Sequence, residues 1–554
     1  MQHQDGKQLN LYQLMLGGLG VLFRLEQRIL ALIVSYSIAI GLVALIVPLT
    51  VQELVNTFAF AIQTITIVTL VAIMVTGLLF VGTFRALQFY AVEMLERRIF
   101  ARIALGMAQQ LPHLQFSKFQ PRYANFFMET IFMQRALAVI LVDLINVIVA
   151  GAVGMTILVF YHPYFILYNA VFLGGFAVVF FIMAHGGLKA TIDTSHAKYD
   201  TLHWLQEVSH NLLHFKSTDS HALLMKRTDE LVQAYATTRQ TRFNILVRQF
   251  MGSVGWQAIA HSGLLGIAGW LLSIGELTLG QLVAAEVVVS GLLASLDAVI
   301  KRMGHIYYFL AGVQELDFLF SLPQDQTVPA LSSPLSNPTD HGVRVTCKTL
   351  ASAPPGLPPA FEQFNLEVTP GEKIGIYADT TATKTALARI LGGIEPPTSG
   401  VIQYNNVDLR HLDLDTINRS RGFIIDSQLT LFDGTIEDNI VLGRSYVSYT
   451  DVQWALRYTG LEHTVDALPQ GLKTHIRAPG IHDDPAHILQ ILIARAILTR
   501  PQLLIFDGIL HALKPSVREP ILRRLCSKDE PWSIIFVSND PNLTPYIDRR
   551  IILN

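Results

Sequence analysis

The chain has 554 residues, of which 51% are hydrophobic and only 15% are charged, whereas soluble globular proteins carry about 25% charged residues. This length allows two or more domains, and the shortage of charge predicts a membrane protein. The formal net charge of −2 excludes a basic surface for nucleic acid and an acidic tail, so no nucleic-acid partner is expected.

Residues 1–28 precede the first long apolar run and lack the basic-then-apolar order of a signal peptide. Within them, residues 9–25 predict an amphipathic helix that lies on the membrane surface. This segment is therefore expected to be a cytoplasmic, elbow-like helix before the first span.

Lys and Arg are absent from three windows, at 29–84, 136–188 and 249–300. Because about 20 apolar residues cross the hydrocarbon core, each window predicts two membrane-spanning helices. The six predicted spans are 29–56, 63–90, 136–160, 164–186, 246–274 and 281–308. Turns without positive charge are expected from Asn56, Tyr161 and Ser273.

Segments 85–135 and 189–248 hold seven and eight Lys or Arg residues, which places them in the cytoplasm together with both termini. Their helical periodicity predicts that spans continue as long helices below the membrane. Within them, 113–124 and 211–219 are expected to form the segments that couple the two domains. The predicted location is the inner (plasma) membrane, with the lipid bilayer as a partner.

The windows contain few ionisable residues, which are costly in a membrane. Glu53, Asp143, Glu276 and Asp297 lie near span ends or turns and are expected to reach water. Glu286 lies deeper in the sixth span, where it either makes an inter-helix hydrogen bond or faces a cavity for a cationic or polar substrate.

The membrane domain is expected to cover residues 29–321, and the proline-rich, weakly apolar residues 322–342 predict a linker. After it, over 343–554, short β-branched runs alternate with helical stretches, which is typical of a soluble α/β domain. Its two cysteines have no disulfide or zinc-site spacing, so no metal site of that kind is expected.

This order of elements resembles the half-transporters of ABC exporters, including type I secretion and peptide exporters. Six framework segments carry the resemblance: PGEKIGI from Pro370, PPTSGVI from Pro396, LFDGTIEDNI from Leu431, LPQGLKT from Leu468, ARAIL from Ala494 and LLIFD from Leu503. The implied fold class is an α-helical six-span membrane domain plus an α/β P-loop-NTPase-like ABC nucleotide-binding domain.

Three residues that contact Mg-ATP in the family are retained. The segment at the Walker A motif, GxxxxGK[ST], reads ADTTATKT over 378–385 and keeps Lys384 for phosphate and Thr385 for Mg²⁺. Asp507 ends the Walker B strand, at the position that reaches Mg²⁺ through water. The resemblance implies weak Mg-ATP binding at these residues, or none.

The other chemistry-bearing positions depart from the family. Side chains replace the Walker A glycines, whose conformational freedom lets backbone amides wrap phosphates. The LSGGQ signature becomes DDPAH at 483–487, in which the proline has no N–H, and a glycine replaces the glutamate that polarises the attacking water. The departing residues are Ala378, Asp379 and Thr383 (Walker A), Ser427 (Q-loop), Asp483, Asp484 and Pro485 (signature), Gly508 (catalytic glutamate), Lys514 (D-loop) and Asn539 (H-loop).

These departures predict a degenerate ATPase domain without catalytic residues. The first hypothesis is a pseudo-ATPase subunit of an export or secretion assembly. The alternatives are an ATP-driven half that works in a heterodimer with a competent ABC partner, and a non-transport membrane scaffold or regulator. The expected partner is a second copy or another ABC half-transporter, together with a membrane-fusion protein in a secretion assembly.

Overall fold

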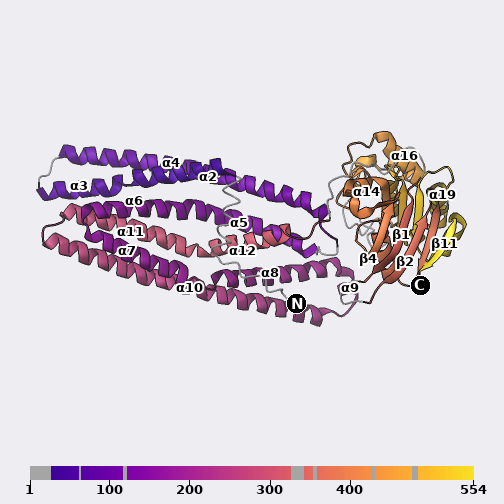
Figure 1. Cartoon of the computed structure of the whole chain (residues 1–554). Coiled ribbons are helices and arrows are strands. Elements are labelled where there is room, and N and C mark those ends of the chain that lie inside the picture. The colour runs from indigo at the N-terminus through magenta and orange to yellow at the C-terminus, as the bar shows by residue number, and fades with distance from the viewer. Residues whose placement is uncertain are drawn as a thin grey trace. The chain divides into compact units, whose positions relative to one another are not determined.

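The computed structural model describes residues 26–60, 64–116, 121–325, 342–353, 358–425, 431–476 and 485–553. The chain divides into two compact units. One is all-helical and extends to Leu322, and the other is an α/β unit formed mainly by Pro323–Asn554 (Figure 1). The expected fold class, a helical membrane-type domain plus an α/β nucleotide-binding-type domain, is confirmed.

The helical unit consists of long rods that lie side by side (Figure 1). Its helices are α2 (Gln27–Ala44), α3 (Ile46–Phe60), α4 (Thr64–Gln110), α5 (Glu129–Ala138), α6 (Ile145–Tyr161), α7 (Tyr164–Ala177), α8 (Gly187–His210), α9 (Leu212–Ser217), α10 (His221–Ser273), α11 (Leu279–Lys301) and α12 (Met303–Phe320). Short π-helical segments, Val139–Leu144 and Val178–Ile182, extend α5 and α7.

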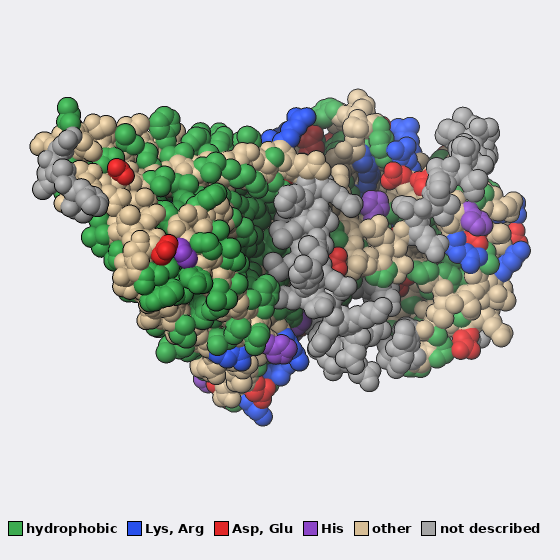
Figure 2. All heavy atoms as spheres, turned by 60° about the vertical axis from the view of Figure 1, so that its left-hand side comes forward, with side chains coloured by type: hydrophobic (Ala, Val, Ile, Leu, Met, Phe, Trp, Pro, Cys, Tyr) green, Lys and Arg blue, Asp and Glu red, His purple; other side chains and the backbone are tan. Residues whose placement is uncertain are grey.

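Five helical stretches among the described residues are long and apolar enough to cross a membrane: Gln27–Phe58, Thr64–His113, Asn125–Tyr161, Tyr164–His210 and Leu279–Lys301. They cover five of the six predicted spans. Hydrophobic side chains accordingly cover most of the helical unit on the face shown in Figure 2, whereas charged side chains are frequent on the α/β unit. Residues 246–273 of the predicted span 246–274 lie within α10, which is not one of the five stretches.

The predicted continuation of spans as long helices is visible in two cases. α4 and α10 contain 47 and 53 residues, which correspond to about 70 and 80 Å at 1.5 Å per residue. Both lengths exceed twice the ~30 Å thickness of the hydrocarbon core. The predicted turn from Asn56 is wrong, because α3 continues to Phe60 through residues that contain neither glycine nor proline.

Two of the predicted turns occur where expected, and one of them is fixed by a helix cap. The chain turns after Tyr161 and again after Ser273. At the start of α11, the Thr278 hydroxyl accepts the Gln281 amide at 3.2 Å, and the Gln281 side chain accepts the Thr278 amide at 2.8 Å. This reciprocal capping box satisfies two amides that a helix start leaves open.

A buried polar network ties three helices of this unit together. Gln88 of α4 is fully buried and donates to the Ser37 hydroxyl of α2 at 2.8 Å. The amides of Gln88 and Asn146 of α6 also bond to each other, with one bond of 3.0 Å. In an apolar environment such bonds join helices that gain little from hydrophobic contact alone.

The predicted coupling segments are partly described. α9, Leu212–Ser217, is a short helix inside the predicted 211–219. Of the predicted 113–124, residues 117–120 lie outside the described residues. The same holds for residues 1–25 of the predicted N-terminal helix and for 326–341 of the predicted linker.

The α/β unit is built on a five-stranded parallel sheet with the order β11-β3-β10-β9-β6. A four-stranded antiparallel sheet, β2-β1-β4-β5, lies beside it in the unit. The strands are β1 (Val345–Ser352), β2 (Phe361–Val368), β3 (Lys373–Ala378), β4 (Ser399–Tyr404), β5 (Val407–Asp408), β6 (Arg421–Ile425), β7 (Gly434–Thr435), β8 (His475–Ile476), β9 (Leu503–Asp507), β10 (Ser533–Val537) and β11 (Arg549–Leu553).

The helices of this unit are α13 (Thr381–Leu391), α14 (Leu414–Ser420), α15 (Ile436–Val441), α16 (Tyr449–Thr459), α17 (Glu462–Asp466), α18 (Pro485–Ile497) and α19 (Pro515–Leu525). Every residue of β3, β9 and β10 is buried, as expected for parallel strands covered on both faces. Since parallel strands end at the same edge of the sheet, the ends of β3, β9 and β10 bring the predicted site residues together.

Candidate functional site

The candidate site lies where β3 passes into α13. β3 ends at Ala378, and α13 begins at Thr381, so only Asp379 and Thr380 connect strand and helix. In a phosphate-binding loop the residues up to the GK pair remain non-helical and their amides point at the phosphates. Here the helix starts three residues before Lys384 and occupies that space.

Two backbone amides of this segment, those of Thr383 and Lys384, already have partners. Thr380 is the N-cap of α13, and its hydroxyl accepts the amide of Thr383 at 3.1 Å. The Thr380 carbonyl accepts the amide of Lys384 at 3.1 Å. Thr383 adds a hydroxyl bond of 3.1 Å to the carbonyl of Ala360. The two amides at the former Gly-Lys pair therefore satisfy the helix rather than a ligand.

A second pair of bonds fixes the end of β3. The side-chain amide of Asn539, which follows β10, donates to the Ala378 carbonyl at 2.7 Å. The Asn539 side-chain oxygen accepts the Ala378 amide at 3.1 Å. The residue at the H-loop position thus binds backbone at the residue that replaces the first Walker A glycine.

Of the three retained residues, Lys384, Thr385 and Asp507, only Thr385 and Asp507 bond to each other. The Thr385 hydroxyl donates to the carboxylate of Asp507 at 2.7 Å, and Asp507 is only 2% exposed. Oxygen ligands of this kind suit Mg²⁺. Lys384 is half-buried, and its ammonium makes no hydrogen bond or ion pair within the described part of the chain.

The structure also places several of the other departing positions. Gly508 has a φ of 71°, so a glutamate there would have to adopt the left-handed conformation, at about 1–2 kcal/mol. Lys514 is exposed and caps α19, and Pro485 is the exposed first residue of α18. Asp379 is exposed at the amino end of α13, where a negative charge favours the helix dipole but opposes a phosphate. Ser427, Asp483 and Asp484 lie outside the described residues.

These residues therefore suit the Mg²⁺ ion of Mg-ATP but not its triphosphate. Thr385 and Asp507 have the chemistry to hold Mg²⁺, but the segment 378–383 does not form a cradle for a triphosphate. No residue in this segment has a positive φ, and the amides of Ala378 and Thr383 are bonded to the side chains of Asn539 and Thr380. Sequence reasoning missed Thr380, although a threonine just before a helix is an N-cap signal.

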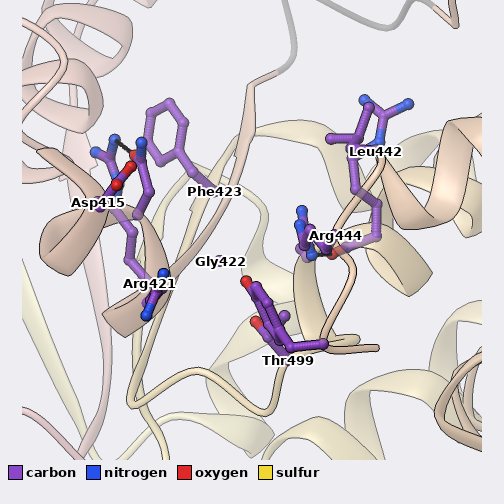
Figure 3. A pocket seen from close by; sticks show the side chains of 12 residues that line it. Asp415, Arg421, Gly422, Phe423, Leu442, Arg444 and Thr499 are labelled. Carbon is purple, nitrogen blue, oxygen red and sulfur yellow. Dashed lines mark hydrogen bonds between the residues drawn. The ribbon is translucent and has the colours of Figure 1, made fainter. Parts of the chain in front are cut away.

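A cavity lies elsewhere, at the amino end of β6. Its volume is about 490 Å³, and Figure 3 shows Arg421 and Arg444 on its walls. Four arginines line it but only one acid: Arg419, Arg421, Arg444 and Arg495, with Asp415. None of the four arginines forms an ion pair with another described residue.

Burial makes this surplus of positive charge costly. Burial lowers the pKa of Arg421 and of Arg444. Burial and the neighbouring Arg444 lower the pKa of Arg495 to about 10. One nitrogen of Arg421 is buried without a hydrogen-bond partner in the described structure. The cavity is therefore an electropositive surface that an acidic group would stabilise.

Two of the five acids in the predicted spans and turns, Asp143 and Asp297, pair with an arginine or a lysine. Asp143 pairs with Arg302, and Asp297 pairs with Lys301 at 2.6 Å. Glu276 is exposed in the turn between α10 and α11. Glu53 is exposed on α3. That these four acids lie near span ends and reach water stays a prediction.

The helical unit and the α/β unit that follows it have the fold of an ABC exporter: a membrane-type helical domain joined to an ABC nucleotide-binding domain. Residues 361–510 match the ABC transporter family. The fold is that of a bacterial Atm1-family ABC exporter solved with ATP bound, with a TM-score of 0.83 over 96% of this chain and 94% of that chain at 18% identity.

Among curated proteins, the chain is similar to the probable multidrug resistance ABC transporter YheI of Bacillus subtilis. The two are 26% identical over 290 residues, which cover 52% of this chain and 49% of YheI. The fatty acid ABC transporter of Mycobacterium tuberculosis is 29% identical over 260 residues, 47% of this chain and 39% of that protein. Leukotoxin translocation protein LktB of Mannheimia haemolytica is 23% identical over 337 residues, 60% and 47% of the two chains. The chain thus spans about half the length, or less, of these relatives.

Proposed function

We propose that the chain is a catalytically impaired, pseudo-ATPase subunit of an ABC-type export assembly. The observation that carries this proposal is the early start of α13 at Thr381, which commits the amides of Thr383 and Lys384 to the Thr380 cap. Catalysis of phosphoryl transfer depends almost entirely on positioning and electrostatics. A domain without a phosphate cradle or a catalytic glutamate lacks both.

In this role the α/β unit works as a scaffold. The ATP sites of ABC transporters are shared between two nucleotide-binding domains, so each partner supplies one face. A homodimer of this chain would have two inactive sites, and a heterodimer would have one damaged face in each. The assembly then depends on docking, and the arginine-lined cavity provides a surface for an acidic segment of another subunit.

The alternative function, an ATP-driven half in a heterodimer, is favoured by one contact. Thr385 and Asp507 keep the hydroxyl–carboxylate pair that serves Mg²⁺, and that pair is of no obvious use to a scaffold. The distinction between these functions rests on nucleotide binding and turnover.

The test uses the full chain in lipid nanodiscs, with Mg-ATP turnover and equilibrium ATP binding measured on the same sample. We expect no turnover above that of empty nanodiscs and no saturable binding below millimolar ATP. Robust hydrolysis, or sub-millimolar binding that Lys384→Ala removes, would contradict the proposal.

The partner is identified by affinity purification of the native complex from its host membrane, followed by subunit identification. We expect a second copy or an ABC half-transporter with intact motifs, and a membrane-fusion protein in a secretion assembly. Arg444→Glu reverses charge in the cavity and is expected to reduce recovery of the partner. Arg523→Glu, on the exposed side of α19, is the matched control and should not.

A further inference from the structure

The arginine-lined cavity at the amino end of β6 has room for a ligand and an opening through which a ligand can enter. Its volume of about 490 Å³ lies within the range of about 300–1,000 Å³ that is typical of small-molecule sites. Arg419 and Tyr446 on its wall are exposed, whereas Gly422 is buried. The cavity therefore extends from the surface of the α/β unit into its interior.

Several elements position the arginines of this cavity. Arg419 lies in the last turn of α14, and Arg421 begins β6 (Figure 3). Arg444 follows α15, and its Nη1 donates to the carbonyl of Arg495 on α18 at 3.3 Å. Arg495 is itself fixed by two hydrogen bonds to Asn439, of 2.6 and 3.2 Å. Folding thus gathers like charges, which repel one another unless an anion lies among them.

The charge of the cavity is far from balanced. Guanidinium groups remain protonated in proteins, so four arginines and the single acid Asp415 leave a net charge of +3. The nearby acid Asp413 is already used, because it caps α14 by accepting the amide and the hydroxyl of Thr416, each at 2.7 Å. An anion with two or more charges would balance this surplus better than a single carboxylate.

Most guanidinium donors of the cavity remain available to such an anion. Each arginine has five N–H donors, and the four side chains make only four hydrogen bonds within the described residues. Arg419 makes none of these, and its guanidinium lies 5.5 Å from the ring centre of Tyr446. One nitrogen of Arg421 is buried, so the expected contacts are with the exposed Arg419 and the half-buried Arg444.

We propose that this cavity binds a small phosphorylated molecule that carries at least two negative charges. The oxygens of a phosphate group match the paired donors of a guanidinium group. Leu442 and Tyr446, which are 45% and 58% exposed, provide an apolar wall for the rest of the molecule. The binding does not depend on the proposed function, but one consequence rests on it: a bound anion would compete with the acidic segment of another subunit.

The test measures binding of radiolabelled inorganic pyrophosphate to the full chain in nanodiscs of zwitterionic lipid, with binding to empty nanodiscs subtracted. EDTA is present, so no metal ion at Thr385 and Asp507 contributes. We expect saturable binding that added salt weakens. Arg444→Gln should weaken it by about tenfold or more, because a charge-assisted hydrogen bond is lost. Arg523→Gln, at an exposed position of α19, is the matched control and should leave it unchanged.

Arg419→Gln changes an exposed side chain and keeps the test valid if the Arg444 variant unfolds. The proposal is overturned if the wild-type chain shows no saturable binding, or if both glutamine variants bind pyrophosphate as tightly as the wild type. It is also overturned if Lys384→Ala removes the binding instead, since that result would place the anion at the Walker A segment.

A second measurement separates this site from the proposed function. Pyrophosphate added during affinity purification of the native complex is expected to lower recovery of the partner. Unchanged recovery together with intact pyrophosphate binding would contradict the docking of an acidic segment and would still support the anion site.

Discussion

At the scale of single residues, two short side chains determine what the edge of the sheet can bind. Thr380 caps α13 by accepting the amide of Thr383, and Asn539 forms two bonds to the backbone of Ala378. In both cases a side chain of the protein occupies backbone groups that would otherwise be available to a phosphate. Removing the cap therefore tests how firmly α13 holds its first turn.

Thr380→Ala is expected to destabilise the α/β unit by about 1 kcal/mol, because loss of an N-cap hydroxyl leaves a helix amide unsatisfied. Hydrogen exchange of the peptide covering residues 378–391 should accelerate. Thr381→Ala changes an exposed neighbour that makes no cap bond and should leave the exchange unchanged. Equal exchange in both variants would show that the cap has no role.

At the scale of elements, the difference from a phosphate-binding loop is a matter of length. The connection between β3 and α13 is two residues long, too short to curve around a phosphate. A phosphate-binding loop needs glycines that can adopt non-helical conformations, and residues 378–383 contain none, whereas Thr380 is a favourable N-cap. The element itself can therefore be tested by restoring glycine.

The combined change Ala378→Gly, Asp379→Asn, Thr380→Gly and Thr383→Gly is expected to create ATP binding without hydrolysis. It frees the amides and removes the acid, whose charge about 4 Å from a phosphate would oppose binding by roughly 4 kcal/mol at an effective dielectric of 20. A gain of about tenfold or more should be measurable by ATP titration. The same variant with Lys384→Ala should lose the gain, and the absence of any gain would refute this explanation.

How far the sequence predicts these elements depends on how local their causes are. The strand LLIFD ending at Asp507 and the turn after Ser273 were predicted because a buried apolar run and a break between two apolar spans are local signals. The contact between His261 and Glu286 joins residues 25 positions apart on two helices, and no periodicity indicates it. The arginine-lined cavity likewise collects residues from separate elements, so composition alone gave no sign of it.

At the scale of the whole molecule, the predicted arrangement in the membrane still needs direct measurement. The helices α4 and α10 are long enough to cross a bilayer and continue beyond it. The positive-inside rule places both termini in the cytoplasm and the turn at Gly275 and Glu276 outside. Chemical labelling of cysteines distinguishes this orientation from its reverse.

The native thiols should be silent in such an experiment. Cys347 is buried and Cys526 is partly buried, and burial raises the pKa of each to about 12, so almost no thiolate is present at pH 8. We therefore expect Glu276→Cys to react with a membrane-impermeant maleimide in intact cells, and Asp219→Cys to react only after permeabilisation. The opposite labelling pattern would show that the orientation in the membrane is the reverse of the predicted one.

The two hydrogen bonds between the Asn539 side chain and the Ala378 backbone affect how the domain responds to ATP and ADP in the cell. In an active ABC nucleotide-binding domain, this edge of the sheet rearranges when ATP is bound and hydrolysed. Here it is fastened internally by Asn539, so the shape of the domain should stay the same at every ratio of ATP to ADP. In an assembly that contains this subunit, the ATP-driven conformational change would have to come from another subunit. This one would keep the same conformation throughout.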